Sequence, residues 1–458
     1  MSAHSTDTIF ARASGAGKAG VALYRLSGPE AFRIARDLTG KRKLTREPGM
    51  AALKDPASGA LIDKGLVFAF KGPRSFTGED VVELTLHGSR AVEEALYDAL
   101  ARLGARPADA GEFTLRAFRA GKMDLAQVEA LADLLDSETS LQRMQALGQL
   151  GGRLSALAEE WRAGLLQVMT PLEADIDFPD EEGVPAAVAA RAGPAIAGLK
   201  SSLTMFLNQS VRARMIRDGV SIAIIGAPNA GKSSLVNALA GSDVAIVSDT
   251  PGTTRDVIET RLNLSGIAAT IADTAGLRGM AGDVIEIEGM RRAKLRAESA
   301  DIRVLVVDSS RIASREDVIT GRDENVPRGT IDLMKSGDII AWNKSDCGRM
   351  IKTGASDFIE IPISAKTGAG MPELIAALTE KVAGKDDAGG PALTRARHVA
   401  AVEEALAALT RAEGLIATAP ELAAEDARLA ARALGTITGA VGVEDVLTEI
   451  FSSFCIGK

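Results

Sequence analysis

SIAIIGAPNAGKSSLVNAL, residues Ser221–Leu239, is the most informative stretch of this chain. An apolar, β-branched run leads into Gly226-x-x-x-x-Gly231-Lys232-Ser233, and a segment with helical periodicity follows. This pattern predicts a strand, a phosphate-binding loop and a helix. Glycines let the backbone aim its N–H groups at a phosphate, Lys232 reaches the β- and γ-phosphates, and Ser233 offers its hydroxyl to Mg²⁺. A chance glycine loop is the alternative, and the flanking strand and helix argue against it.

Length and composition indicate a multidomain protein without a broad basic face. The chain has 458 residues, a net charge of −8 and a pI near 5.3. Any RNA contact must therefore be local or shared with a partner. Two cysteines, Cys347 and Cys455, form no disulfide framework, and no 18-residue apolar run occurs. We expect a cytoplasmic protein that does not enter the membrane.

The order of elements predicts four segments. Residues 1–120 have the pattern of an α+β domain, residues 121–218 and 383–458 are helical, and residues 219–382 alternate strands with helices. The last pattern predicts an α/β P-loop domain, with its ligand at the carboxyl ends of parallel strands, inserted in one helical domain. Within residues 121–218, Pro171 and the acidic run Asp175–Pro185 are expected to end one helix and start another.

Individual elements can be placed from periodicity. In the first segment, strands and helices are expected at Val21–Leu26, Glu30–Leu38, Leu66–Phe70, Val81–Leu86 and Ala91–Leu103. In the P-loop segment, further strands are expected at Ala268–Ala272, Val304–Asp308, Asp338–Trp342 and Ile359–Ile363.

Three more motifs follow predicted strands and indicate guanine nucleotide binding. Asp273-Thr274-Ala275-Gly276 places an aspartate to hold Mg²⁺ through water. In Asn343-Lys344-Ser345-Asp346 the aspartate carboxylate accepts two hydrogen bonds from guanine, a pair that adenine does not offer. Ser364-Ala365-Lys366 completes the base pocket. The expected nucleotide-binding residues are Asn229, Ala230, Gly231, Lys232, Ser233, Ser234, Thr254, Asp273, Thr274, Ala275, Gly276, Asn343, Lys344, Asp346, Ser364, Ala365 and Lys366.

The loop Ser248–Asp256 occupies the position of a first switch, and Thr254 is expected to complete the Mg²⁺ coordination. Leu277 stands where small GTPases place a glutamine that orients water, so another polar residue must take that role, with candidates in Asp283–Glu288. Asn229 is a candidate to lend its amide oxygen to a monovalent cation beside the phosphates, and bracing the loop is the alternative.

Together these motifs resemble the MnmE (TrmE) family of tRNA-modifying GTPases. The matching segments are GAPNAGKSS, SDTPGTTRD, DTAGLR, NKSD, DTIFA, FTGEDVVEL, GEFTLRAF, KMDLAQVEALADL and the terminal FCIGK. The resemblance covers essentially the whole chain, and an FCIGK ending joined to an FTGED domain is specific to the family. Ala227, where arginine is common, and Thr250-Pro251, in place of a more apolar pair, depart from the pattern.

The resemblance implies an N-terminal folate-binding domain that forms a homodimer, a helical domain, and a G domain whose two copies meet across K⁺. It implies a GTPase that acts on tRNA with an MnmG-type flavoprotein carrying FAD, in an expected heterotetramer. The complex would add a carboxymethylaminomethyl group at C5 of the wobble uridine, U34, with 5-formyl- or methylene-tetrahydrofolate as the reduced folate. The rival hypothesis is a GTP-switched ribosome-assembly factor, but the acidic helices supply no basic RNA-binding appendage.

The resemblance also implies roles for single residues. The expected K⁺ ligands are Asn229, Ser248, Thr250 and Thr253. The expected Mg²⁺ ligands are Ser233 and Thr254, and Glu286 would position the attacking water. The expected folate contacts are Arg25, Glu83, Lys122 and Lys458. Cys455, near that folate site, is either a nucleophile toward an activated base or part of the tail.

Overall fold

The chain divides into two compact units in the computed structural model. Unit 1 comprises Met1–Ala132, Gln149–Thr204 and Ala400–Lys458, and unit 2 comprises Asp133–Gly148 and Met205–Val399. The chain thus enters unit 2 twice, at Asp133 and at Met205, and returns to unit 1 each time. The structure describes residues 7–177, 188–246, 259–272, 294–312, 314–323, 326, 329–347, 356–383, 390–441, 447, 450–451, 454 and 457.

The N-terminal part of unit 1 is a six-stranded sheet in the order β3-β4-β5-β2-β1-β6. All its neighbours pair antiparallel except β1 and β6, which run parallel. Residues of α1 and α2 pack with the buried side chains of the sheet, among them Tyr24 and Leu84. The elements are β1 (Ile9–Arg12), β2 (Ala19–Ser27), α1 (Ala31–Thr39), β3 (Gly49–Lys54), β4 (Leu61–Phe70), β5 (Val81–Gly88), α2 (Arg90–Arg102) and β6 (Arg106–Pro107).

The strands and helices predicted for this region are present, but β4 begins at Leu61 rather than at Leu66. The sequence Asp63-Lys64-Gly65 has the composition of a turn, which hides the first half of the strand. A Cβ atom on Gly65 would lie 1.9 Å from the Thr85 carbonyl oxygen of the neighbouring strand. The glycine therefore marks a close approach of two backbones within the sheet, not the end of a strand.

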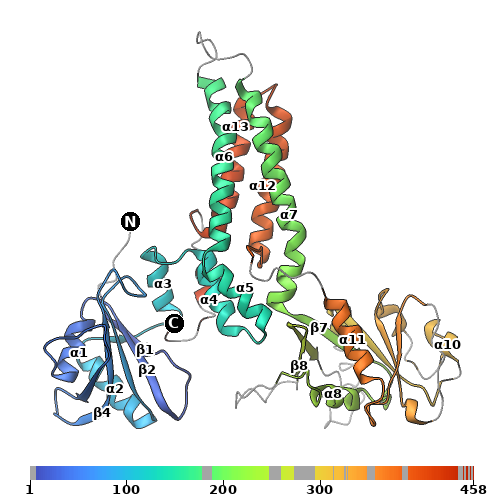
Figure 1. Ribbon diagram of the computed structural model, residues 1–458, viewed down its shortest axis with the longest axis horizontal. Coiled ribbons are helices and arrows are strands. Elements are labelled where there is room, and N and C mark those ends of the chain that lie inside the picture. Colours follow the sequence, from blue (N-terminus) through green and yellow to red (C-terminus); the bar gives the residue numbers. More distant parts are fainter. Residues whose placement is uncertain are drawn as a thin grey trace. The chain divides into compact units, whose positions relative to one another are not determined.

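The other described elements of unit 1 are helices, and α6 and α13 lie side by side (Figure 1). Trp161 of α6 is buried and donates from Nε1 to the Ser202 hydroxyl of α7 at 3.0 Å. The helices are α3 (Glu112–Arg119), α4 (Leu125–Asp136), α5 (Ser140–Leu150), α6 (Arg153–Asp177), η1 (Val188–Arg191), α7 (Ala192–Asp218), α12 (Ala396–Leu415) and α13 (Pro420–Thr438). Helices α4 and α7 begin in unit 1 and end in unit 2, and helices α5 and α12 begin in unit 2 and end in unit 1.

The prediction that Pro171 helps to end a helix is wrong, because α6 runs through it to Asp177. An interior proline costs a helix about 3 kcal/mol. Val168 and Leu172 on either side of it are fully buried. Burial of each such side chain contributes about 1.5–3 kcal/mol, so packing outweighs the lost backbone hydrogen bond. The acidic loop expected after this helix lies mostly outside the described residues.

Unit 2 contains a second six-stranded sheet, in the order β12-β11-β10-β7-β9-β8. Its strands run parallel except β8, which is antiparallel to β9. Residues of α8 and α11 fill the core on one face, and α10 contributes to a separate core with Trp342 on the other. The elements are β7 (Val220–Ile225), α8 (Lys232–Ala240), β8 (Glu259–Leu264), β9 (Ile267–Ala272), β10 (Ile302–Asp308), α10 (Arg315–Ile319), η2 (Ile331–Leu333), β11 (Ile339–Asn343), η3 (Ser345–Cys347), β12 (Ile359–Pro362) and α11 (Met371–Val382).

The strands predicted in this region are therefore present, and they pair in parallel as expected, while β8, which was not predicted, adds an antiparallel edge. Among the described residues, no helix combines the length and the apolar character needed to cross a membrane.

Candidate functional site

The phosphate loop connects β7 to α8 and requires glycine at both of its ends. Gly226 has φ 145° and Gly231 has φ 99°, conformations that other residues rarely adopt. A Cβ atom on Gly226 would lie 2.3 Å from the Val306 carbonyl oxygen, and one on Gly231 would lie 2.1 Å from the Asn343 amide nitrogen. The loop thus packs closely against β10 at Gly226 and against Asn343, the last residue of β11, at Gly231.

Lys232 is the first residue of α8, and its ammonium group turns back across the loop. Nζ donates to the carbonyl oxygens of Gly226 at 2.9 Å and Ala227 at 2.8 Å. The N-terminus of α8 adds its unpaired N–H groups and positive dipole on the same side, which suits an anion. Ser233 is half-buried in this first turn, and Asn229, with φ 61°, is exposed at the tip of the loop.

Asn343 joins three of the predicted motifs. Its buried side-chain amide donates to the Ala230 carbonyl oxygen of the phosphate loop at 2.8 Å. Its Oδ1 accepts from the backbone N–H of Ala365 at 3.0 Å. A buried amide with both ends paired fixes its neighbours in place, because breaking either bond leaves an unpaired polar atom at a cost of about 1–3 kcal/mol. Asn343 therefore acts as a structural link beside the base pocket.

A cavity of about 590 Å³ opens between the phosphate loop, α8 and the two base motifs. It is lined by Gly231, Ser234, Asn237, Ala238, Asn343, Lys344, Asp346, Cys347, Ser364, Ala365 and Lys366. Asp346 is exposed on its wall, and its Oδ1 accepts from the Ser364 hydroxyl at 2.7 Å. That hydrogen bond lowers the pKa of Asp346, so the carboxylate stays ionised and ready to accept guanine donors.

Lys344 connects the base motif to the phosphate loop through Asp308, a residue that the motifs did not predict. Its Nζ donates to Asp308 Oδ2 at 2.6 Å and to the Asn229 carbonyl oxygen at 3.2 Å. Asp308 ends β10 and also accepts from the Ser310 hydroxyl at 2.6 Å. Burial opposes ionisation of Asp308, yet the bonds from Lys344 and Ser310 outweigh it and lower its pKa.

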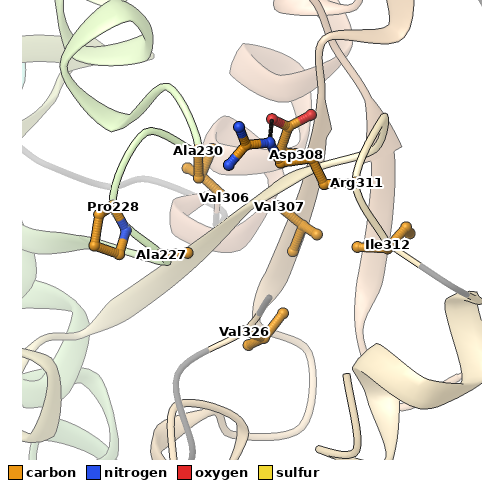
Figure 2. Close-up of a pocket in the computed structure, with 9 residues that line it drawn as sticks. All are labelled: Ala227, Pro228, Ala230, Val306, Val307, Asp308, Arg311, Ile312 and Val326. Atoms are coloured by element: carbon orange, nitrogen blue, oxygen red, sulfur yellow. Dashed lines mark ion pairs between the residues drawn. The ribbon is translucent and has the colours of Figure 1, made fainter. Parts of the chain in front are cut away.

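Asp308 also borders a second, small cavity beside the phosphate loop, shown in Figure 2. This cavity has a volume of about 140 Å³ and is enclosed mainly by apolar side chains. Arg311 lies 3.7 Å from the same carboxylate, and its side chain is 64% exposed. The carboxylate of Asp308 thus has two cations beside it, the partly buried Lys344 and the largely solvated Arg311.

The predicted folate residues Arg25 and Glu83 pair across β2 and β5. They occupy opposite register positions, and Arg25 Nε donates to Glu83 Oε1 at 2.9 Å. The Arg25 guanidinium lies over the Phe76 ring at 5.1 Å and near Phe113 at 5.7 Å. Lys122 passes Gly78, two residues after Phe76, with its Cε 3.4 Å from where a Cβ on Gly78 would be.

Comparison with known proteins shows the family. The family model described as "GTP-binding protein TrmE N-terminus" matches residues 8–122, and the family model described as "MnmE helical domain" matches residues 125–455. The chain belongs to the MnmE family. The tRNA modification GTPase MnmE of Parvibaculum lavamentivorans is 48% identical over 457 residues, which is 99% of this chain and 100% of that protein. That of Caulobacter vibrioides is 48% identical over 455 residues, with 99% and 100% covered.

A solved G domain, from the FeoB iron transporter of T. maritima, is 25% identical over 36% of this chain and 99% of that chain. Its TM-score is 0.26, so the assignment to the MnmE family rests on the full-length relatives. These relatives agree with a multidomain chain of an N-terminal TrmE domain, a helical domain and a GTPase domain.

Two residues of the C-terminal segment that resembles the MnmE family ending, Phe454 and Gly457, are described by the structure. A Cβ on Gly457 would lie 2.0 Å from the carbonyl oxygen of Arg12, which ends β1. The preceding residue of β1, Ala11, is the register partner of Arg25. Phe454 is buried with Phe451 against α4. Gly457 therefore lies beside the end of β1, the strand that pairs with β2, which carries Arg25.

Several residues predicted for the MnmE-type site lie outside the described part of the chain: Ser248, Thr250, Thr253, Thr254, Asp273, Thr274, Ala275, Gly276, Glu286, Cys455 and Lys458. Of the expected K⁺ and Mg²⁺ ligands, the described residues include Asn229 and Ser233. Their roles stay predictions. Asp308 was not among the predicted site residues. A signal for it existed, because it stands at the end of an apolar strand of the same sheet, as the recognised motifs do.

Proposed function

We propose that this chain, a tRNA-modifying GTPase by its family, serves through GTP hydrolysis the modification of the wobble uridine of tRNA. The observation that best supports GTP binding is a single cavity that is lined both by Asp346 and by the phosphate loop. Asp346 would accept from the two donors on the guanine edge, and adenine would leave its charge unpaired. The Ser364 hydroxyl would keep that carboxylate aimed at the base.

The phosphate end of the site supports metal-assisted hydrolysis. Ser233 and Thr254 would hold Mg²⁺, and Asn229 with the loop Ser248–Thr253 would hold K⁺. Bound cations would neutralise charge that develops on the transferred phosphoryl group. The serine in the first turn of α8 and the exposed amide of Asn229 at the loop tip offer the oxygen ligands that these hard ions prefer. Glu286 would orient the attacking water in place of the missing glutamine.

The N-terminal pair supports a folate site. A reduced folate, when bound, would supply the one-carbon unit. Glu83 offers acceptors to a pterin edge, the Phe76 ring offers a flat apolar surface, and Arg25, Lys122 and Lys458 offer positive charge to the glutamate tail. This donor set fits the group. In this proposal the chain forms a cytoplasmic homodimer, and an MnmG-type flavoprotein with FAD completes the carboxymethylaminomethyl transfer to U34.

Mass spectrometry of tRNA nucleosides from a strain that lacks this chain tests the proposal. We expect the 5-substituted wobble uridines to disappear and to return when the intact chain is supplied. Unchanged wobble uridines, together with abnormal ribosomal subunit profiles, would favour the assembly-factor hypothesis instead. Because both hypotheses include GTP hydrolysis, the GTPase assay alone does not separate them.

A further inference from the structure

A basic surface lies at one end of the N-terminal sheet, between α1 and β3. The segment KRKLTR contributes Lys41, Arg42, Lys43 and Arg46, and the turn after β4 contributes Lys71 and Arg74. Five of these six side chains belong to exposed residues, and Lys41 is half-buried. Glu47 is the one acidic residue in the segment 40–49. We call these six residues the basic surface.

The two parts of the basic surface are held together by the sheet. The backbone N–H of Ala69, in β4, donates to the Thr45 carbonyl oxygen at 2.9 Å. Lys71 follows two residues later, and its carbonyl oxygen accepts from the Arg74 N–H at 3.1 Å. The Arg46 guanidinium lies over the Phe70 ring at 5.8 Å. These contacts bring a segment before β3 and a turn after β4 to the same edge of the domain.

The charges of the basic surface are not neutralised within the described part of the chain. None of the ion pairs there involves these six side chains, whereas other exposed arginines of unit 1 have carboxylate partners. Arg33 pairs with Glu30 and Asp37, and Arg90 pairs with Glu94. A group of unpaired cations repels itself, which is unfavourable unless a polyanion binds there.

We propose that the basic surface binds the sugar-phosphate backbone of the tRNA substrate, an inference that rests on the proposed function. The chain as a whole carries a charge of −8, so its general field repels RNA, and a local cationic group must supply the attraction. Arginines suit phosphates because their planar groups donate in pairs. Leu44, the large apolar residue of the segment, packs against the core rather than into solvent, which argues against insertion in a membrane.

The test is a variant of the full-length chain with Arg42, Lys43, Arg46 and Lys71 changed to Gln. The control changes four other exposed arginines of unit 1, Arg90, Arg153, Arg162 and Arg191, to Gln, which alters net charge equally. Fluorescence anisotropy with unmodified tRNA, across a salt series, gives affinity and its salt dependence. We expect tRNA binding at least about tenfold weaker for the first variant, and a salt slope reduced by roughly 0.7–0.9 for each lost phosphate contact. The control should stay within about twofold of the parent.

Equal losses in both variants, or none in the first, would overturn the proposal by showing that net charge or another surface governs tRNA binding. Loss of binding to anionic phospholipid vesicles with retained tRNA affinity would also overturn it, in favour of a membrane surface. GTP hydrolysis without tRNA and the thermal unfolding midpoint should be unchanged in both variants, which confirms that each is folded. Wobble-uridine analysis of the deletion strain tests the proposed function separately, so the two failures are distinguishable.

Discussion

The two six-stranded sheets of this chain place the side chains of the two proposed sites in different ways. In the parallel sheet of unit 2, the polar residues follow the ends of neighbouring strands, as Asp308 does in β10 and Asn343 in β11. In the N-terminal sheet, Arg25 and Glu83 lie within antiparallel strands and meet across the face. Parallel strands bring all their carboxyl ends to one edge, while antiparallel strands bring together residues set by register.

This difference decides what each site tolerates. At the edge of the parallel sheet, loops carry the contacts and single side chains read single groups, as Asp346 would read guanine. On the face of the N-terminal sheet, the proposed folate residues Arg25 and Glu83 are part of the strand pairing itself, and their side chains are 17% and 20% exposed. Substitutions in the site of unit 2 should therefore change ligand binding with little effect on folding. Substitutions at Arg25 or Glu83 should affect both ligand binding and the stability of the N-terminal sheet.

The largest expected effect is at the guanine edge. In Asp346→Asn the amide would present a donor to the guanine donors, so GTP affinity should fall by roughly 10³-fold or more while xanthosine triphosphate is accepted instead. Competition against a fluorescent guanine nucleotide measures both. Cys347→Ser, which alters the next residue of the same cavity wall, is the matched control and should bind GTP normally. Retained GTP preference in Asp346→Asn would show that the base is read elsewhere.

At the phosphate loop, we expect a substitution that lowers the rate of GTP hydrolysis without changing nucleotide affinity. Asn229→Ala should lower K⁺-stimulated GTP hydrolysis by roughly 10²- to 10³-fold, as when one stabilising contact to the transition state is removed, with nucleotide affinity nearly unchanged. Since Asn229 has φ 61°, alanine also adds backbone strain, and Asn229→Gly provides the unstrained comparison. Equal rates of the parent chain in K⁺ and Na⁺ would remove the proposed ion site, whatever the variants show.

In the N-terminal sheet, removing Gly457 and Lys458 should weaken binding of a reduced folate by about tenfold, the loss of one charge-assisted contact. This short deletion spares Phe454, which is buried in a helical core, so the fold should persist. Calorimetry with 5-formyltetrahydrofolate measures the affinity, and unchanged GTP hydrolysis in K⁺ serves as the control. Undiminished folate affinity would mean that the tail serves tRNA or the partner protein.

Motif spacing predicted much of unit 2 and little of the pairing in unit 1. Asn343 and Asp346 could be placed because each follows a recognisable strand in a sheet whose strand ends converge. The Arg25–Glu83 pair depends on the register of two strands, which periodicity does not fix, so it entered only through resemblance. Gly65 hid half of β4 because the sequence does not reveal the approach of the Thr85 carbonyl. The prediction of a helix end near Pro171 failed because the burial of neighbouring side chains, and not the local helix propensity, determines where α6 ends.

The smallest expected effect concerns Asp308, which the motifs missed. Its carboxylate accepts from Lys344 Nζ, which also donates to the Asn229 carbonyl oxygen, so it ties the base motif to the phosphate loop. Asp308→Asn keeps an acceptor but loses the charge, and a charge-assisted bond exceeds a neutral one by about 1 kcal/mol, or roughly fivefold in GDP affinity. The preference for GDP over inosine diphosphate should not change, because Asp346 reads the exocyclic amine.

The matched control is Arg311→Gln, which removes the other cation beside the Asp308 carboxylate. Because the Arg311 side chain is largely solvated, this variant should bind GDP within about twofold of the parent. Calorimetry on both variants distinguishes the two partners: an Asp308→Asn affinity equal to the parent's would mean that the Asn229 carbonyl alone holds Lys344 in place.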